Sequence, residues 1–403
     1  MQPARKTIFY LIVILILFTA SFLVIAPINQ QNIVQSRIEK LQSLPYLAWV
    51  PAENNIKKIG VTKYNSNLAF KGINIYNTEN SAIAYLIDMS GKILHTWTAK
   101  KNYWQHVEMC DNGDLLAICW NHWITKVDWN SNLKWIIKMH VHHDLAIAQN
   151  KDIYTIVKKK EIVFEHGLPV PIYNDYIVII SADGKIKKSI SLYKILKEKI
   201  PPDKFVQAYR WSQQEMIKFN SPLPMHYNIL YINTLEIIKQ DIKGLCKQGD
   251  LLICARNLNL IGIVDIKNER LLWSWGQEDL DYPHYPTLIE NNNILIFDNG
   301  YQRGYSRIVE LNPLTKNIVW EYRTNPPSRF FSKNRGSNQK LPNGNILITE
   351  SDNGRAFEIT QDGEIVWEFY SPQIRIATKE RQALYRVMRI TNPENYSFLK
   401  GLK

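Results

Sequence analysis

A repeated unit of short strands constrains the fold of this chain more than any other feature. Each unit has an apolar strand, a turn rich in Asn, Asp and Gly, and a second apolar strand, a pattern typical of a tight hairpin. The four clearest copies are Glu108–Cys119, Leu245–Cys254, Thr287–Phe297 and Gln339–Thr349. Further strands follow and end in tryptophan, and three of these residues lie 47 positions apart: Trp273, Trp320 and Trp367. A fixed period in this range, with four strands per unit, is typical of a β-propeller.

Six such units can be traced, so the sequence predicts an all-β, six-bladed β-propeller. The first unit, which starts at Gly72, lacks one strand, and the C-terminal stretch Tyr385–Ile390 is the expected substitute. This pairing would close the ring and remove exposed strand edges. A helix-like insertion from Tyr193 to Pro224 and an excursion from Thr234 to Lys243 interrupt the repeat, and the fourth unit is expected to begin at His226.

The N-terminal segment predicts a membrane anchor. Residues Ile8 to Ala26 form an almost unbroken apolar run without a charge, long enough to span a bilayer as a helix. Arg5 and Lys6 precede the run, which favours a cytoplasmic N-terminus. A cleaved signal peptide, processed near Thr19–Ser21, is the alternative. Both interpretations place the rest of the chain outside the cytoplasm. The retained anchor is favoured, so we expect a single-pass protein of the inner membrane with its propeller on the periplasmic side.

Three segments describe the expected domain organisation. Residues 1–30 form the anchor, and residues 31–71 form a stalk or linker that contains an amphipathic stretch from Gln31 to Leu44. Residues 72–403 form the propeller.

The four cysteines suggest two disulfides for an exported chain, but their spacing favours free thiols. Cys110 with Cys119, and Cys246 with Cys254, flank equivalent hairpins, and within a hairpin neither pair lies directly opposite. The sequence contains no Cys-x-x-Cys motif of the kind that holds structural zinc.

The formal net charge of +12 is spread along the chain. Its one compact block, Lys158–Lys160, is more typical of a solvated face than of a nucleic-acid site, so no nucleic-acid partner is expected. A positive field would still draw anionic small molecules toward a channel mouth.

Seven motifs, most of them in the fourth and fifth units, carry a resemblance to a known family. They are His226–Asn228, Cys254–Asp265 leading into Trp273–Gly276, Pro283–His284, Ile296–Gly300, Tyr305–Arg307, Leu341–Asn345 and Gly354–Glu358. In this order they make the chain after Gly72 similar to the bacterial arylsulfate sulfotransferases, which are membrane-anchored or periplasmic six-bladed propellers.

The resemblance implies an activity and a set of site residues. In that family a channel histidine attacks the sulfur of an aryl sulfate, and the resulting sulfohistidine passes the group to a phenol. By position, His284 corresponds to this nucleophile and Arg256 to a clamp for the sulfate. His226 and Asn228 correspond to hydrogen-bond donors for the sulfuryl or bridging oxygen, and His143 to a histidine from the preceding blade.

The residue types fit this chemistry without the family. Sulfuryl transfer depends on positioning and positive charge. A neutral imidazole is a competent nucleophile, and a histidinium can protonate a departing phenolate. No cofactor or metal is needed. His226 and Asn228 are two residues apart, so on a strand their side chains would face the same way. His142 and His143 would face opposite ways, and the alignment with His284 favours His143.

Other interpretations remain for several residues. A zinc site of three histidines is conceivable, but a guanidinium beside it would oppose cation binding. The turn at Asp298–Gly300 is expected to hold the channel wall. Arg307 is expected either to pair with this turn or to contact the anion from behind the first ring of residues, and Ser337 and Asn338 are further candidates for the channel wall. Structural roles are expected for the remaining histidines, His95, His106, His122, His140 and His166.

Two classes of function follow. The first is a sulfotransferase that moves a sulfuryl group from an aryl sulfate donor to a phenolic acceptor by a ping-pong reaction, without a nucleotide donor. The alternative is a non-catalytic extracytoplasmic propeller that binds a protein or an anionic glycan. The two differ in whether His284 becomes sulfated.

Overall fold

The computed structural model describes residues 48–100 and 103–400 and divides them between two compact units. The larger unit contains Leu47–Lys159, Tyr173–Ile200 and Asn228–Lys403. The described part of the smaller unit contains Lys160–Ile172 and Pro201–Tyr227.

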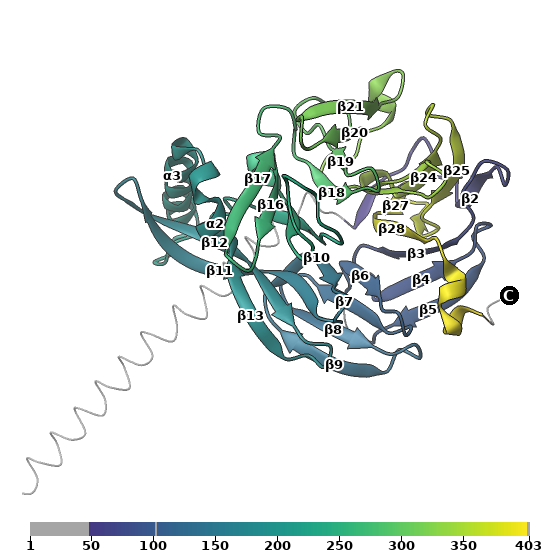
Figure 1. The fold of residues 1–403 in the computed structure, drawn as a ribbon, viewed down its shortest axis with the longest axis horizontal. Helices are drawn as coiled ribbons and strands as arrows, with labels where there is room; N and C mark the ends of the chain where they lie inside the picture. Colours follow the sequence, from purple (N-terminus) through teal and green to yellow (C-terminus); the bar gives the residue numbers. More distant parts are fainter. Residues whose placement is uncertain (1–47, 101–102, 401–403) are drawn as a thin grey trace, which may run out of the picture. The chain divides into compact units, whose positions relative to one another are not determined.

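Antiparallel sheets of four or five strands, six in the described residues, make up the fold (Figure 1). The first contains β28 (Leu384–Ile390), β3 (Ile73–Thr78), β4 (Ile83–Ile87) and β5 (Ile93–Thr98). The second contains β6 (His106–Met109), β7 (Leu115–Cys119), β8 (Trp123–Val127) and β9 (Leu133–Lys138). The third contains β10 (Val141–Ile147), β11 (Ile153–Glu165), β12 (Leu168–Ile180) and β13 (Ile186–Ser191).

The remaining sheets follow the same order along the chain. The fourth contains β14 (Ile232–Ile237), β15 (Leu251–Ala255), β16 (Leu260–Asp265) and β17 (Arg270–Trp275). The fifth contains β18 (His284–Leu288), β19 (Ile294–Asp298), β20 (Arg307–Asn312) and β21 (Asn317–Tyr322). The sixth contains β22 (Ser337–Lys340), β23 (Ile346–Glu350), β24 (Arg355–Ile359), β25 (Ile365–Tyr370) and β2 (Gly60–Tyr64). A small sheet joins β1 (Trp49–Pro51), β27 (Glu380–Gln382) and β26 (Ile374–Arg375).

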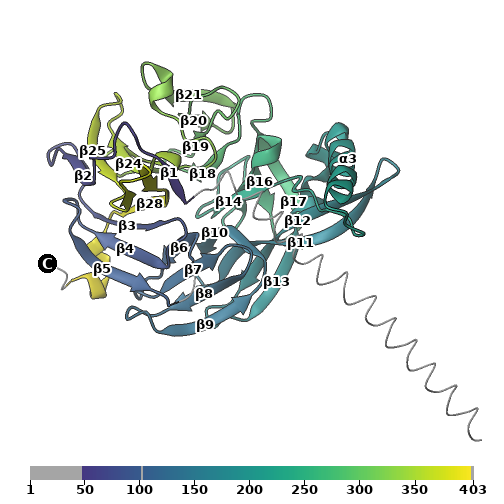
Figure 2. The ribbon, with the colours of Figure 1, turned by 180° about the vertical axis from the view of Figure 1, so that it is seen from behind.

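The expected C-terminal substitute for the missing strand is confirmed. Strand β28 pairs antiparallel with β3, and the two lie side by side in both views (Figure 1 and Figure 2). The first strands of successive sheets also contact one another in the order β6, β10, β14, β18, β22, β28. The ring of His106 on β6 lies 5.5 Å from that of Tyr385 on β28, which returns the series to its start. Residues far apart in sequence therefore meet along these inner strands.

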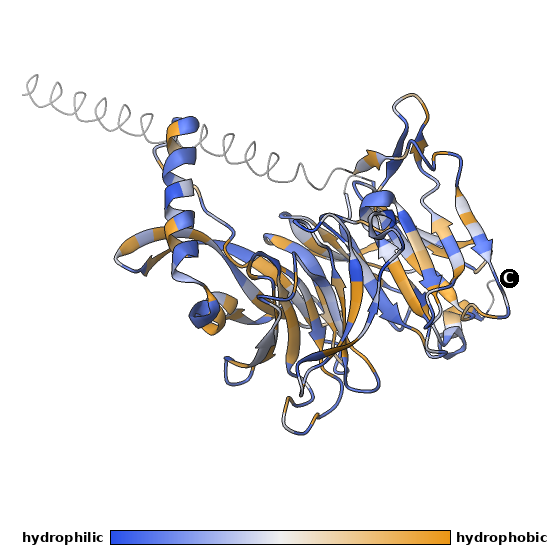
Figure 3. Ribbon diagram, turned by 90° about the horizontal axis from the view of Figure 1, so that it is seen from above, coloured by the Kyte–Doolittle hydropathy of each residue, from blue (hydrophilic) through white to orange (hydrophobic). Residues whose placement is uncertain are grey.

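The core lies between neighbouring sheets. The second strands β7, β15, β19 and β23 are buried along their whole length, because both faces of each sheet are covered. These strands are therefore continuous apolar runs, without the alternation of a half-exposed strand. In Figure 3 hydrophobic residues follow the strands, while the connecting turns are mainly hydrophilic.

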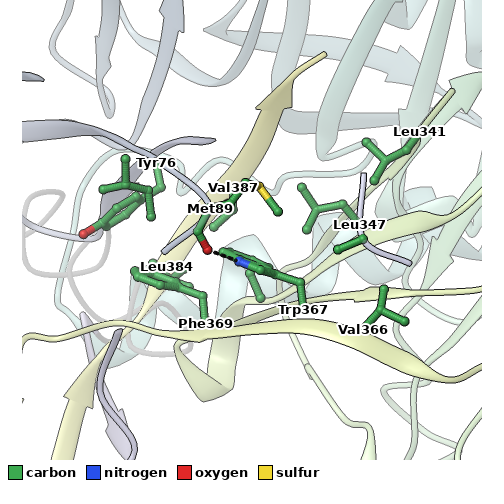
Figure 4. Packing of buried hydrophobic residues seen from close by; sticks show 12 residues of the cluster. Tyr76, Met89, Leu341, Leu347, Val366, Trp367, Phe369, Leu384 and Val387 are labelled. Atoms are coloured by element: carbon green, nitrogen blue, oxygen red, sulfur yellow. Dashed lines mark hydrogen bonds between the residues drawn. The ribbon is translucent and has the colours of Figure 1, made fainter. Parts of the chain in front are cut away.

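Tryptophans on outer strands link one sheet to the next. Each of four donates its indole N–H to a backbone carbonyl in a turn of the following sheet, and two of them, Trp97 and Trp367, are fully buried. The pairs are Trp97 to Gly113 (3.2 Å), Trp135 to Ala182 (3.2 Å), Trp273 to Pro313 (3.0 Å) and Trp367 to Met89 (2.9 Å). The last pair lies in a cluster of buried apolar side chains (Figure 4). At these four positions the repeated tryptophan therefore acts as a junction between sheets.

The predicted helical insertion is present and the predicted excursion is shorter than expected. Helix α2 (Leu192–Leu196), the 3₁₀ turn η2 (Lys197–Lys199) and helix α3 (Pro202–Lys218) follow the third sheet. Helix α3 starts with proline at its first turn, where no backbone donor is lost. Thr234 lies inside β14, so the excursion begins only after Ile237.

Short 3₁₀ turns complete the described elements. They are η3 (Arg256–Leu258), η4 (Pro327–Arg329), η5 (Ser351–Asn353), η6 (Pro393–Asn395) and η7 (Ser397–Leu399).

Two N-terminal predictions concern residues before the first sheet. The apolar run from Ile8 to Ala26 and the stretch from Gln31 to Leu44 lie outside the described residues. Within the described ranges, no helix has both the length and the apolar character needed to cross a membrane. The described end of the predicted linker contributes β1 and β2 to sheets.

Candidate active site

Irregular pairing at the start of two inner strands aims polar side chains away from the regular pleat. In β10 the register shifts between His142 and Leu145, and in β18 it shifts between His284 and Thr287. His143 (φ 60°) and Tyr285 (φ 45°) both adopt the left-handed conformation that is uncommon for non-glycine residues. Bulges of this kind often redirect side chains next to active sites.

This register corrects the alignment of the two adjacent histidines. His142 pairs with Ile156 just before the bulge, as His284 pairs with Phe297, so His142 is the structural equivalent of His284. His143 is the equivalent of Tyr285. The two histidines also do not face opposite ways, because the positive φ of His143 brings their Nδ1 atoms to 2.7 Å.

One ring nitrogen of His284 is fixed by two acceptors. Its Nδ1 lies 2.7 Å from Oδ1 of Asn299 and 3.1 Å from the carbonyl oxygen of Tyr282. The orientation of the Asn299 amide follows from its other contacts, since Nδ2 donates to the carbonyls of Ser332 (2.6 Å) and Arg335 (2.9 Å). Nδ1 of His284 therefore carries the proton, and Nε2 carries the lone pair.

The lone-pair nitrogen of His284 is buried and unused. The residue is 6 % exposed, and within the described ranges Nε2 has no hydrogen-bond partner. Burial, followed by the nearby positive charge of Arg256, lowers the pKa of His284 to about 3. The imidazole is thus neutral at physiological pH and presents a nucleophilic nitrogen.

Arg256 stands at the end of β15, in η3, and is held by two aromatic rings. Its guanidinium carbon lies 3.5 Å from the ring centre of Tyr231 and 5.2 Å from that of Tyr282. Its Nε and Nη2 both donate to Oδ1 of Asn257, at 3.3 and 3.2 Å. Asn257 is fixed in turn by a 2.6 Å hydrogen bond to the carbonyl of Asn228. Stacking and hydrogen bonding orient a cation that can face an anionic group.

His143 belongs to the same electrostatic environment. Burial, and then the charges of His142, Arg256 and His284, hold its pKa well below the ordinary value. Its ring packs edge-on against Tyr231 at 5.0 Å between centres. The structure therefore brings together three of the residues that the sequence predicted for the site, His143, Arg256 and His284.

The other two predicted residues have different positions. Asn228 precedes β14, where its Oδ1 accepts the backbone N–H of Tyr231 (2.9 Å) and its carbonyl holds Asn257. Its side chain thus shapes the loop beside Arg256. His226 belongs to the smaller unit, and its assignment to the site stays a prediction. Neither residue lies in a strand, so the argument that their side chains share one strand face is wrong.

The predicted pairing of Arg307 with the turn at Asp298–Gly300 is confirmed. Nε of Arg307 donates to Oδ2 of the fully buried Asp298 at 2.7 Å, and Arg303 adds a second contact at 3.1 Å. Asn338, on β22, donates to the carbonyl of Tyr285 at 3.0 Å. The turn after β19 is thereby held in place, with its Asn299 in contact with His284.

The prediction of a solvated lysine block is wrong for its first residue. Lys158 is only 8 % exposed, and its Nζ lies 4.7 Å from the ring centre of Tyr173 and 5.5 Å from that of Trp120. Its charge lowers the pKa of both His142 and His143, although burial is the larger cause. Lys159 and Lys160 are exposed as expected.

The remaining histidines and the cysteines agree in part with expectation. His95 stacks on Trp129 at 3.6 Å and has a structural role. His106 differs, because its buried Nε2 lies 3.4 Å from Asp144 among the inner strands. All four cysteines are free, as the spacing suggested.

A cavity of about 680 Å³ lies toward the other ends of the inner strands. Asp144, Glu236, Tyr285 and Arg386 belong to its wall, whereas His143, Arg256 and His284 do not. The candidate chemistry therefore sits at the starts of the inner strands rather than in this cavity.

Sequence reasoning missed several residues of the site. Tyr231 and Tyr282 lie far from Arg256 in sequence, and no local pattern marks a guanidinium sandwich. Asn299 could have been found, since it follows Asp298 in the recognised Asn-Gly turn. His142 could also have been found, but its alignment with His284 was missed because the sequence favoured the neighbouring His143.

Known proteins resemble this chain at the level of family and of fold. A family model described as arylsulfotransferase (ASST) matches residues 106–372. No curated protein matches the chain.

Among solved structures, a protein of unknown function from Bacteroides caccae is 12 % identical with a TM-score of 0.51, over 79 % of this chain and 99 % of that one. A streptogramin B lyase is 13 % identical (TM-score 0.47, 85 % and 97 % covered). The WD40 β-propeller domain of Doa1 is 11 % identical (TM-score 0.42, 78 % of each chain covered). The first likeness concerns the fold alone, and the two lower scores carry no argument.

Proposed function

Because the chain belongs to the arylsulfotransferase (ASST) family, we propose that it transfers a sulfuryl group from an aryl sulfate to a phenol through a sulfohistidine at His284. The observation that carries this proposal is the state of His284. Its Nδ1–H is held by Asn299 and Tyr282, and its Nε2 is buried, neutral and without a hydrogen-bond partner in the described residues.

In the first half-reaction, the lone pair of Nε2 attacks the sulfur of the donor. The N–S bond forms, the bond from sulfur to the aryl oxygen breaks, and the electron pair leaves on the phenolate. The ring then becomes a sulfo-imidazolium, and the acceptors at Nδ1 stabilise its positive charge. Arg256 faces the sulfuryl oxygens, where its fixed charge lowers the barrier.

In the second half-reaction, the oxygen of the acceptor phenol attacks the same sulfur while its proton passes to a neighbouring base. The S–N bond breaks, and its electron pair returns to Nε2 of His284. Because one site handles both partners in turn, the kinetics are ping-pong. The reaction needs no metal, cofactor or nucleotide donor, since each partner supplies or receives the sulfuryl group directly.

The scaffold and location belong to the same proposal. Six sheets of four or five strands, linked by tryptophans and by the β28–β3 pairing, support a six-bladed propeller. The apolar run from Ile8 to Ala26 supports a single membrane-spanning anchor, with the catalytic body on the periplasmic side. His226 is included as a further donor to the sulfuryl group.

Transfer from a chromogenic aryl sulfate to a phenol tests the proposal. The wild-type chain should show turnover, and His284→Asn should lose it while keeping the wild-type unfolding midpoint. His95→Asn is a matched control, because that histidine stacks on Trp129 outside the site, and it should retain activity. Absence of turnover in the wild type with several donors would favour the non-catalytic propeller.

A further inference from the structure

A carboxylate and two histidines form a buried chain of contacts beside the proposed nucleophile. Asp175, on β12, is fully buried, and its Oδ1 lies 3.1 Å from Nε2 of His142. Nδ1 of His142 lies 2.7 Å from Nδ1 of His143. The chain ends at Nε2 of His143, in the environment of Arg256 and His284.

The proton positions follow from the chemistry of these atoms. A carboxylate only accepts, so Nε2 of His142 carries a proton. Burial keeps both imidazoles neutral by lowering each pKa, and Nδ1 of His142 is therefore the acceptor in the contact between the rings. Nδ1 of His143 then donates, which leaves the lone pair of His143 on Nε2.

The backbone of His143 is fixed independently of these contacts between Asp175, His142 and His143. Its N–H donates to Oε1 of Gln105 (3.0 Å), and its carbonyl accepts the hydroxyl of Tyr385 (2.5 Å). These contacts hold the positive φ that turns the His143 ring toward His142. The geometry is thus built to present one nitrogen of His143 in one tautomer.

We propose that Asp175 and His142 are positioning residues that make Nε2 of His143 the base for the acceptor phenol. This inference rests on the proposed sulfuryl transfer and deepens it. In the second half-reaction, Nε2 of His143 takes the phenol proton as the phenol oxygen forms its bond to sulfur. The Nδ1 proton of His143 can then shift toward His142, so that positive charge develops beside Asp175.

The proton is returned during the next cycle. Protonated His143 donates it to the phenolate that leaves the following donor, and the base is restored. The charged and titratable groups that act on His143 are His142, Arg256, His284 and Lys158. Asp175 and Lys158 act on His142. Of these groups, Asp175 is the anion, and it supplies the counter-charge for a protonated histidine pair.

The substitution Asp175→Asn tests the inference sharply. Oδ2 of Asp175 accepts the backbone N–H of Ile232 at 2.9 Å, so the amide oxygen of asparagine should take that role. Its NH₂ group would then donate to Nε2 of His142, so that this nitrogen would have to be unprotonated. His142 would donate from Nδ1, and Nε2 of His143 would become protonated. The substitution therefore reverses the direction of the hydrogen bonds from residue 175 through His142 to His143, which we call the relay, without truncating a side chain.

The first measurement is kinetic and uses the full chain. In Asp175→Asn, the single-turnover burst of a good leaving group should stay within about threefold of wild type. Transfer to a weakly acidic phenol should fall about 10²- to 10⁴-fold, the usual contribution of a general base. The loss should shrink for acidic phenols, which ionise without help. An equal loss in the burst and with every acceptor would overturn the inference.

The second measurement keeps the inference testable if transfer is absent. In [¹⁵N]histidine-labelled protein, assigned with His142→Gln and His143→Gln, the ¹⁵N shifts of the two rings should show protons on Nε2 of His142 and Nδ1 of His143. Asp175→Asn should invert both. Unchanged shifts would refute the relay, whereas failed transfer with inverted shifts would refute only the proposed function.

Asp152→Asn is the matched control for both measurements. Asp152 is a buried carboxylate in the turn between β10 and β11, at the opposite end of β10 from the histidines, and it is paired with Lys187 at 2.7 Å. Its loss should leave the burst, the acceptor dependence and the ¹⁵N shifts as in wild type. Shifts that changed equally in Asp152→Asn would assign the effect to general loosening of the sheet.

Discussion

Replacing Arg256 by lysine should slow sulfuryl transfer although the positive charge remains. Lysine cannot stack flat on Tyr231, where the guanidinium carbon lies 3.5 Å from the ring centre, and it lacks the planar fork that Asn257 holds. Losing the stacking costs about 0.5–1 kcal/mol, and losing one charge-assisted hydrogen bond costs about 1.5–3 kcal/mol. Together these give about 2–4 kcal/mol, or about 30- to 900-fold in kcat/KM.

The pH dependence of the rate separates the effect of the planar guanidinium of Arg256 from the effect of its positive charge. Attack requires neutral His284, so the rate falls on the acid side as the pH drops below the pKa of that residue. Arg256 is the second cause, after burial, of the lowering of this pKa to about 3. Arg256→Lys keeps the charge and should leave the acid limb in place. Arg256→Gln removes it, so the pKa of His284 should rise and the acid limb should move toward neutral pH, while burial keeps it below about 6.5.

The assay is the burst rate of a chromogenic aryl sulfate between pH 2.5 and pH 8, a range that includes the pKa of about 3 for His284, for wild type and both variants. Activity of Arg256→Lys within about threefold of wild type would show that the planar fork is not used. An unchanged acid limb in Arg256→Gln would show that His284 does not feel this charge. Unfolding midpoints in urea serve as the control for folding.

Two further predictions concern stability. Trp367→Phe leaves the Met89 carbonyl without its buried indole donor and should lower the free energy of unfolding, measured in urea titrations, by about 1–3 kcal/mol. The decrease should be larger than for Trp320→Phe, which lies on a half-exposed strand, and an equal decrease would contradict the junction role of Trp367. Burial raises the pKa of Glu108 and of Glu236 to about 7 in the folded state. The Glu108 side chain lines the cavity and is 41 % exposed, so solvent screens its charge more than that of a fully buried carboxylate. Because these folded-state pKa values are raised, the stability that the two carboxyls contribute is fully present below about pH 4.5 and is lost as the pH rises through about 7. Substituting glutamine at both positions should remove this part of the pH dependence between pH 5 and pH 8.

The scaffold was largely predictable because its signals are local. Asn-Gly turns, apolar strand pairs and evenly spaced tryptophans depend on neighbours within one sheet. The pairing of β28 with β3 could also be inferred, since the first unit lacked a strand and an unpaired edge is unfavourable. The predicted start of the fourth sheet at His226 is wrong, because that motif precedes the sheet and β14 begins at Ile232.

The site was only partly predictable because its geometry depends on irregular backbone. Alternation along a strand predicted opposite faces for His142 and His143, but the bulge and the positive φ bring their rings together. Sequence spacing could not show that Asp175, on a different strand, would reach His142. The burial of Lys158 was hidden for the same reason, since Trp120 and Tyr173 cover it from elsewhere in the chain.

The central claim is that Nε2 of His284 carries the sulfuryl group between donor and acceptor. Rapid-quench mass spectrometry of the full chain, mixed with an aryl sulfate in the absence of acceptor, tests it directly. The account predicts a sulfuryl adduct on the peptide that contains His284, formed at the rate of phenolate release and discharged when a phenol is added. Phenolate release without any such adduct, or an adduct on a different histidine, would contradict it.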